Sequence, residues 1–190
     1  MKHRFVFSLF IFAVSLFVFI PPLFADGAAD YYGVTINKFE LDNGTSWITV
    51  FSGTSSELDI ASASSGTSAG NFFSGLVVPD GTYTRCRVTP SPIFKIRGTD
   101  GAGSYTTAAN GVGGGSTLTL NINQKATCTI TLTGGNVPGA TPQDFSATPI
   151  TVTDGVANHK VRVSFNVSAA VQLLGGELWP AAPAVTMTIQ

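Results

Sequence analysis

The chain has 190 residues, of which 11% are charged, and its formal net charge is −1. So weak a charge argues against nucleic acid or an anionic membrane surface as a partner. The polar residues are mostly Ser, Thr, Asn and Gly, which is common in exported β-proteins and leaves few ionisable groups for catalysis.

The first 25 residues have the layout of a secretory signal peptide. Lys2 and Arg4 precede an apolar run of 16 residues, 5–20, which ends at two prolines. Cleavage is expected after Ala25 and would take the net charge to −3. The alternative is an uncleaved membrane anchor, although the run is shorter than the ~20 residues of a spanning helix. We therefore expect a secreted, periplasmic or cell-surface protein, which contacts a membrane only if this segment is retained.

A flexible lead is expected over residues 26–32, and a single domain over 33–190. Apolar and polar residues alternate in YGVTINKFEL and SWITVF, with a register change near Lys38. Asn43 and Gly44 separate the two runs and predict a hairpin with a type I′ turn. ELDIAS follows, and then a loop of small residues, 61–71.

FFSGLVV ends at a Pro-Asp-Gly turn, and TYTRCRV and IFKIRG are predicted strands around a kink at Thr89–Pro92. Residues 98–116 are rich in glycine, and so long an irregular segment is either mobile or functional. In the second half, TLTLNI, ATCTITLT, HKVRVSFNV and AVTMTIQ alternate, and TLTLNI is expected to turn Leu118, Leu120 and Ile122 to one face. Eight to ten short strands without an amphipathic helix predict an all-β protein, a sandwich or an open barrel.

Few residues carry catalytic or metal-binding chemistry. His159 lies at a predicted turn, and no GxSxG motif accompanies it, so no catalytic role is expected. Glu57 and Asp59 share a strand face, which we interpret as solvent-exposed rather than as a glycosidase pair. Four turns carry aspartates without the acidic spacing of a calcium loop, so a calcium site would require several turns to meet. We predict no catalytic residue, no metal site and no cofactor.

The stretches NGTSWITVFSG, ELDIA, GLVVPDGTYTRCRV and VTDGVANHKVRVSFNVSAAVQL resemble a bacterial envelope-protein family of unknown function. The resemblance covers most of residues 33–173, with gaps. The matching residues are Trp47, Leu58, Ile60, Leu76, Gly81, Tyr83, Phe165 and Asn166. It implies an immunoglobulin-like or prealbumin-like antiparallel β-sandwich in the cell envelope and supplies no catalytic residue. This chain departs from the family in its two cysteines, its segment 98–116 and its lack of a lipid-anchoring cysteine.

Cys86 is a candidate for chemistry, because it lies between Arg85 and Arg87, and positive neighbours activate a thiol. Strand alternation instead places Cys86 on the inner face, and both arginines on the outer face with Tyr83. Cys128 is also expected to point inward. Since export favours disulfides, we predict a Cys86–Cys128 bond.

The leading hypothesis is a non-enzymatic module for binding or surface structure, with a glycan or an envelope protein as partner. Loops 61–71 and 98–116 would provide recognition. Ligand contact is predicted at Tyr105, Arg85 and Arg87, and further aromatic candidates are Phe72, Phe73 and Trp179. One alternative is a fibre subunit assembled by strand addition, with YGVTINKFEL or AVTMTIQ as donor. The other is a secreted hydrolase.

Overall fold

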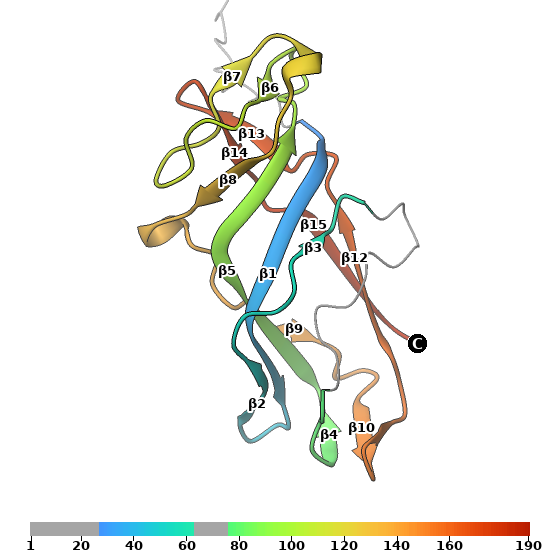
Figure 1. Cartoon of the computed structure of the whole chain (residues 1–190). Helices are drawn as coiled ribbons and strands as arrows, with labels where there is room; N and C mark the ends of the chain where they lie inside the picture. The colour runs from blue at the N-terminus through green and yellow to red at the C-terminus, as the bar shows by residue number, and fades with distance from the viewer. Residues whose placement is uncertain (1–26, 63–75) are drawn as a thin grey trace, which may run out of the picture.

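The structure, a computed structural model, describes residues 27–62 and 76–190 and contains two layers of antiparallel strands (Figure 1). The first layer is a six-stranded sheet of β1 (Ala29–Asp42), β2 (Trp47–Ser52), β3 (Leu58–Asp59), β5 (Arg85–Gly98), β8 (Cys128–Thr131) and β9 (Gln143–Asp144). Its strand order is β2-β1-β5-β8, with β3 paired to β1 and β9 paired to β5.

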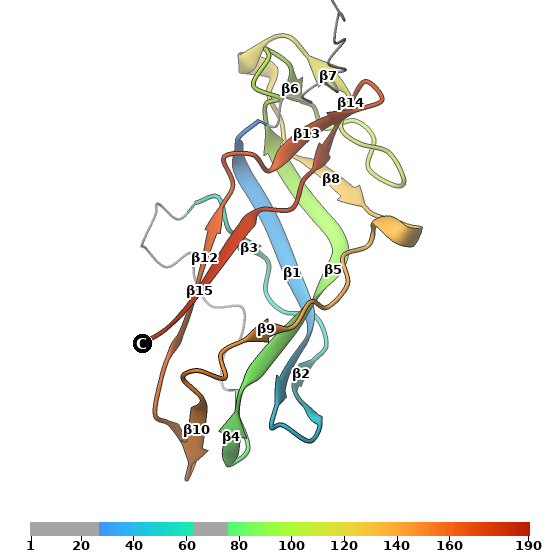
Figure 2. The same ribbon diagram turned by 180° about the vertical axis from the view of Figure 1, so that it is seen from behind.

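The second layer lies behind β1 and β5 in the view of Figure 1 and in front of them in Figure 2. It consists of two ribbons, β12 (Val161–Asn166) with β15 (Ala184–Ile189), and β13 (Val171–Leu174) with β14 (Glu177–Pro180). The remaining elements are β4 (Gly81–Tyr83), β6 (Tyr105–Thr106), β7 (Leu118–Thr119), β10 (Ile150–Thr153) and β11 (Val156–Ala157), with short 3₁₀ turns η1 (Ile122–Gln124) and η2 (Gly134–Asn136). The all-β, antiparallel sandwich class is confirmed.

β1 and β5 are the longest strands, with 14 residues each, and they pair along most of their length. One prediction about them was wrong, and a second was only partly right. β1 begins at Ala29, inside the expected flexible lead, because Ala29 pairs with Gly98 of β5. The expected kink at Thr89–Pro92 coincides with an irregularity, because the register of the β1–β5 ladder shifts around the Ile36–Pro90 pair. It does not divide the segment into two strands, since β5 continues through it and the shift accommodates Pro90, which has no N–H.

The predicted hairpin at Asn43–Gly44 joins β1 to β2, with Asp42 paired to Trp47. The type I′ turn was wrong. Four residues form the loop, the Asn43 N–H donates to the Ser46 carbonyl (3.2 Å), and within this loop the positive φ is at Gly44 (86°). The register change near Lys38 is confirmed, because the β1–β2 ladder shifts between Phe39 and Glu40.

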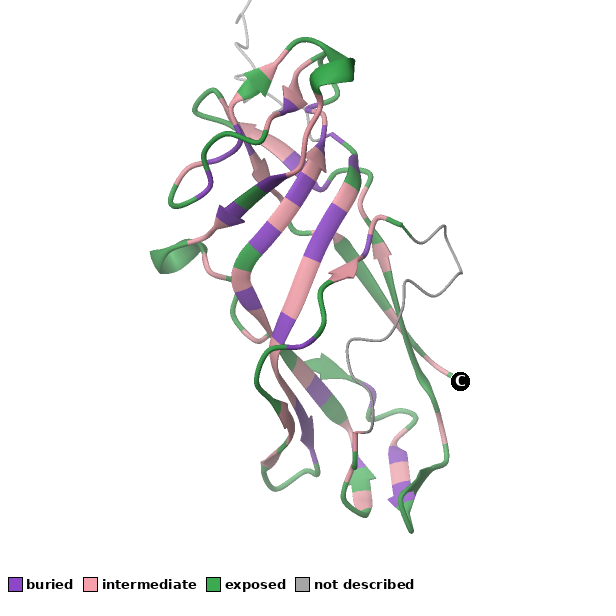
Figure 3. Cartoon of the chain, in the orientation of Figure 1, coloured by how far each residue is buried: buried purple, intermediate pink, exposed green. Residues whose placement is uncertain are grey.

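The core follows the buried stripes of β1 and β5 in Figure 3 and falls into two clusters. The first cluster includes Ile96, Cys128, Ile130, Val171 and Leu178, and the second includes Leu41, Tyr83, Cys86, Phe145, Ile150 and Val152. Tyr83 was expected on the arginine face and is instead buried. β4 ends at Tyr83, so the alternation of β5 does not extend to it, and its hydroxyl donates to the Pro79 carbonyl (2.7 Å).

The alternating segments ATCTITLT and TLTLNI differ in burial. Cys128 and Ile130 of β8 are buried, as the pattern predicts. TLTLNI was expected to be a core strand, but its strand, β7, ends after two residues, and Leu118, Leu120 and Ile122 are exposed. Alternation identified the side chains that share a face, but it did not show whether that face meets the core.

The predicted Cys86–Cys128 disulfide was wrong, because both cysteines are buried free thiols. Cys86 faces Leu41, whereas Cys128 faces Ile96, ten residues further along β5. At ~3.3 Å per residue these positions are roughly 30 Å apart, and a disulfide requires Cα atoms within about 7 Å. The Cys128 thiol donates to the Ala109 carbonyl (3.4 Å), while Cys86 Sγ lies 4.0 Å from Met187 Sδ.

Burial raises the pKa of Cys86 to about 11 and also raises the pKa of Cys128, so neither thiol should react in the native protein. We expect alkylation without reductant to label both cysteines after unfolding and neither before. Intact-mass spectrometry counts the labels on the native and on the unfolded protein. A protein that takes up label only after reduction would contradict the free-thiol assignment.

Candidate functional site

The glycine-rich segment 98–116 is docked against two strands. Thr131 of β8 donates its N–H to the Gly111 carbonyl, and Gly113 donates back to the Thr131 carbonyl (3.2 Å). Further along, Ser116 and Leu178 of β14 exchange two backbone hydrogen bonds of 2.7 and 2.9 Å. The segment therefore links the first layer to the β13–β14 ribbon.

Two of its glycines are required by these close approaches. A Cβ atom at Gly111, where φ is 141°, would lie 2.1 Å from the Thr129 carbonyl oxygen. A Cβ atom at Gly115 would lie 2.6 Å from the Leu178 carbonyl oxygen and 2.7 Å from Trp179 Nε1. The glycine content therefore serves backbone packing against β8 and β14.

Glu177 of β14 is hydrogen-bonded to the same glycine-rich segment. Its Oε1 accepts a hydrogen bond from Asn110 Nδ2, and its Oε2 accepts one from the Gly115 N–H, both at 2.9 Å. The carboxylate at the start of β14 thus has N–H donors on both oxygens. This arrangement places Gly115 against the edge of the Trp179 indole.

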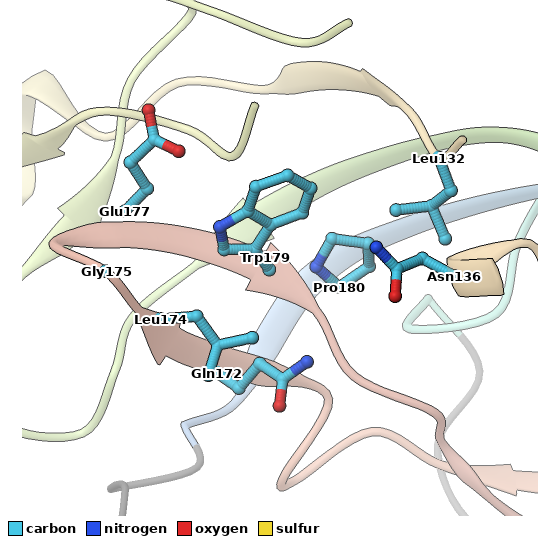
Figure 4. Close-up of a pocket in the computed structure, with 8 residues that line it drawn as sticks. All are labelled: Leu132, Asn136, Gln172, Leu174, Gly175, Glu177, Trp179 and Pro180. Atoms are coloured by element: carbon cyan, nitrogen blue, oxygen red, sulfur yellow. The ribbon is translucent and has the colours of Figure 1, made fainter. Parts of the chain in front are cut away.

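A groove of about 440 Å³ lies beside this junction, with the Trp179 indole at its centre (Figure 4). Trp179 and Gln172 are cross-strand partners, and so are Glu177 and Leu174, so one face of the β13–β14 ribbon provides most of the groove. The other face carries Val171 and Leu178, both fully buried. The groove is lined by Leu132, Asn136, Gln172, Leu174, Gly175, Glu177, Trp179 and Pro180.

The groove combines an aromatic surface with hydrogen-bonding amides. The Trp179 indole is half-buried, and the side chains of Gln172 and Asn136 each bring two donors and an acceptor. Such a mixture suits a ligand that has an apolar face and several hydroxyl groups.

The arginines predicted to contact a ligand lie elsewhere and are already engaged. Arg85 Nε donates to Asp42 (2.7 Å), and Arg87 Nε donates to Glu40 (2.7 Å). Both guanidinium groups also lie over the Trp47 ring, at 5.5 and 4.2 Å from its centroid. The arginines of β5, their carboxylate partners on β1 and Trp47 of β2 thus form a row across three strands. None of these residues lines the groove.

The hydrogen bond from Arg87 lowers the pKa of Glu40 from 4.5 to about 2, against burial, which raises it. Because the folded pKa is the lower one, this pair contributes full stability above about pH 4.5 and loses it as the pH falls towards 2. We expect Glu40→Gln to flatten the fall in melting temperature over this range. The measurement is the melting temperature as a function of pH. Plots for the wild type and the variant that run parallel between about pH 4.5 and 2 would contradict the assignment.

Of the predicted aromatic contacts, Trp179 lines the groove and Tyr105 does not. Tyr105 is half-buried in β6, where it pairs with Thr119. Phe72 and Phe73, with most of loop 61–71, lie outside the described residues. Sequence reasoning missed the other residues of the groove, although Gly175-Gly176 between two short apolar runs was a hairpin signal, and both glycines have positive φ (60° and 84°).

The carboxylates considered for catalysis and metal binding have protein partners. Glu57 accepts from the Tyr31 hydroxyl (2.6 Å) and pairs with Lys95, and Asp59 Oδ1 accepts the backbone N–H groups of Tyr32 and Ala61. His159 lies in a turn before β12. Within residues 27–62 and 76–190, no three His, Cys, Asp or Glu side chains are grouped so as to hold a metal ion.

In comparisons with protein-family models, curated proteins and solved structures, nothing matches this chain. The resemblance to an envelope-protein family therefore stays a prediction. The described part of the chain has no helix with the length and apolar character needed to cross a bilayer.

Proposed function

We propose that this protein is an exported, non-enzymatic β-sandwich module of the immunoglobulin-like or prealbumin-like type, and that it binds a glycan in the groove at Trp179. The observation that carries the proposal is the Trp179 indole, half-buried at the centre of a groove that also presents Gln172 and Asn136. Export rests on the signal-like residues 1–25, and the resemblance to envelope proteins is consistent with it.

The chemistry of the groove favours a sugar over a charged ligand. A pyranose ring has an apolar C–H face, which can stack on an indole, and hydroxyl groups at its rim, which can bond to amides. Glu177 is the charged residue of the groove, and N–H donors already meet both of its oxygens. The volume of about 440 Å³ also lies in the usual range for small-ligand sites, about 300–1,000 Å³.

The experiment is a glycan array with the full chain, followed by titration of any ligand found. We expect Trp179→Ala to weaken binding by at least about tenfold, equivalent to ~1.4 kcal/mol, through loss of the stacking surface. Trp179→Phe, which keeps an aromatic ring, should retain part of the affinity.

Tyr105→Ala is the matched control, because Tyr105 is an aromatic residue that lies outside the groove. It should bind like the wild type. Equal losses in Trp179→Ala and Tyr105→Ala, with both variants folded, would place the ligand elsewhere, and an array without any ligand would count against the glycan.

A fibre subunit assembled by strand addition is the second candidate. Within the described residues, β12 and β15 pair with each other and with no further strand, so each has an open edge. β15 has no charged residue, and Val185 in it is half-exposed. The other expected donor, YGVTINKFEL, lies in β1, which is paired on both sides. A strict monomer in size-exclusion chromatography at all concentrations would argue against assembly.

A further inference from the structure

An exposed apolar tip is formed by β7 and the loop that leads from it towards β8. It consists of Leu118, Leu120 and Ile122, which are 37%, 82% and 56% exposed. A single exposed leucine is ordinary, but three apolar side chains within five residues at the end of a loop form a patch. Residues 117–124 include no charged side chain.

The tip is held by its own hydrogen bonds and by an ion pair. Asn121 Oδ1 accepts the Asn123 N–H (3.0 Å), and the Thr119 hydroxyl donates to Gln124 Oε1 (2.9 Å). Lys125 follows the tip and pairs with Asp30 near the start of β1. The apolar side chains are therefore presented on a fixed loop, with several neighbouring polar groups satisfied internally.

The tip lies at the end of the molecule where the described chain begins. Gly27 is packed so closely on Thr99 that a Cβ atom would lie 1.8 Å from the Thr99 carbonyl oxygen. Thr99 forms a bridge to Tyr105, and Tyr105 pairs with Thr119, next to Leu118 and Leu120. In Figure 1, β6 and β7 lie at this end, and β4 and β10 lie at the opposite end.

When the apolar run 5–20 is retained as an uncleaved anchor, the alternative to cleavage after Ala25, it holds this end of the described chain near a membrane. Its last residue, Ile20, is joined to Gly27 by six residues, 21–26, which span at most about 25 Å when fully extended. While the run is in a bilayer, the bilayer surface must lie within that reach of Gly27, and so near the tip.

We propose that the tip is a membrane-contact surface, which inserts Leu120 and Ile122 into the bilayer interface while residues 5–20 are retained. The occupant is lipid, because the tip is apolar, uncharged and next to the point where the chain leaves the bilayer. This contact would orient the domain with β4 and β10 away from the membrane. It is independent of the groove at Trp179.

The test uses the full chain, made in a cell-free system without signal peptidase and reconstituted in phosphatidylcholine vesicles. Leu120→Trp places an indole on the tip, and Val156→Trp places one at a 70% exposed position on β11, which pairs with β10 at the far end. The native Trp47 and Trp179 contribute the same background to both variants.

We expect the added indole of Leu120→Trp to emit at shorter wavelength in vesicles and to be quenched by brominated phosphatidylcholine, and Val156→Trp to show neither effect. Ile122→Trp, also on the tip, should behave like Leu120→Trp. If quenching of both tip variants is no greater than that of Val156→Trp, the tip does not touch the bilayer and the proposal fails.

Discussion

Replacing Gly115 with alanine is expected to destabilise the protein by about 1–3 kcal/mol, because the added methyl group overpacks a closed junction. Its Cβ would lie 2.6 Å from the Leu178 carbonyl oxygen and 2.8 Å from Trp179 Cδ1. A movement of the indole would relieve only the contact with Trp179, so segment 98–116 must also move away from the backbone of β14. We therefore also expect weaker ligand binding in this variant.

Gly114→Ala is the matched control one residue away. A Cβ atom there has its nearest neighbours at 3.7 Å, both oxygens of Glu177, which is ordinary contact. Its stability should match or slightly exceed that of the wild type, since alanine reduces the entropy of the unfolded chain. Urea unfolding of the three proteins gives the comparison. Equal stabilities for Gly115→Ala and Gly114→Ala would mean that the segment is not docked on β14.

Leu178→Ala is expected to cost about 2–5 kcal/mol, a large part of the ~5–15 kcal/mol that stabilises a typical domain. Leu178 is fully buried in the first core cluster, where its side chain meets both layers. Removing three carbon atoms there leaves a cavity beneath the β13–β14 ribbon. The backbone bonds between Leu178 and Ser116 remain possible, so the loss should come from packing.

Leu174→Ala, on the opposite face of the same ribbon, provides the comparison. Leu174 is 40% exposed and lines the groove, so its truncation should change the free energy of unfolding by less than about 1 kcal/mol. Denaturant unfolding measures both variants. If Leu174→Ala costs as much as Leu178→Ala, the two faces of the ribbon have been assigned the wrong way round.

The strands were predictable where local chemistry decides the structure. The Asn43–Gly44 hairpin needs a residue that tolerates positive φ, and the alternation of Cys128 and Ile130 follows from the two faces of a strand. Both features depend on neighbours in the sequence. The same alternation in Leu118, Leu120 and Ile122 gave the wrong environment, because burial depends on what the rest of the chain places opposite.

The wrong prediction of a disulfide shows what strand periodicity cannot predict. The alternation correctly predicted that Cys86 and Cys128 point inward. It holds no information on how far apart two inward positions lie along a sheet. That separation is set by the register of β5 with β1 and β8, which places Cys86 opposite Leu41 and Cys128 opposite Ile96. Two buried cysteines are therefore not sufficient evidence for a bond.

The candidate site was predictable only in part. Trp179 was among the aromatic candidates, and segment 98–116 was singled out by its glycines, but nothing in the sequence joined them. Glu177 makes the connection through Asn110 and Gly115, which are more than 60 positions away along the chain. Strand alternation places Arg85 and Arg87 on the outer face of the strand, but it holds no information on their carboxylate partners on β1.

The central claim, that a glycan binds at Trp179, is tested most directly by the indole N–H signals in ¹H–¹⁵N NMR spectra. The chain has two tryptophans, so the signal of Trp47, which lies under the two arginines, is an internal control. During titration with a glycan from the array, we predict that the Trp179 indole signal shifts in proportion to occupancy and that the Trp47 signal stays in place. A bound glycan that leaves the Trp179 signal unmoved would contradict the claim.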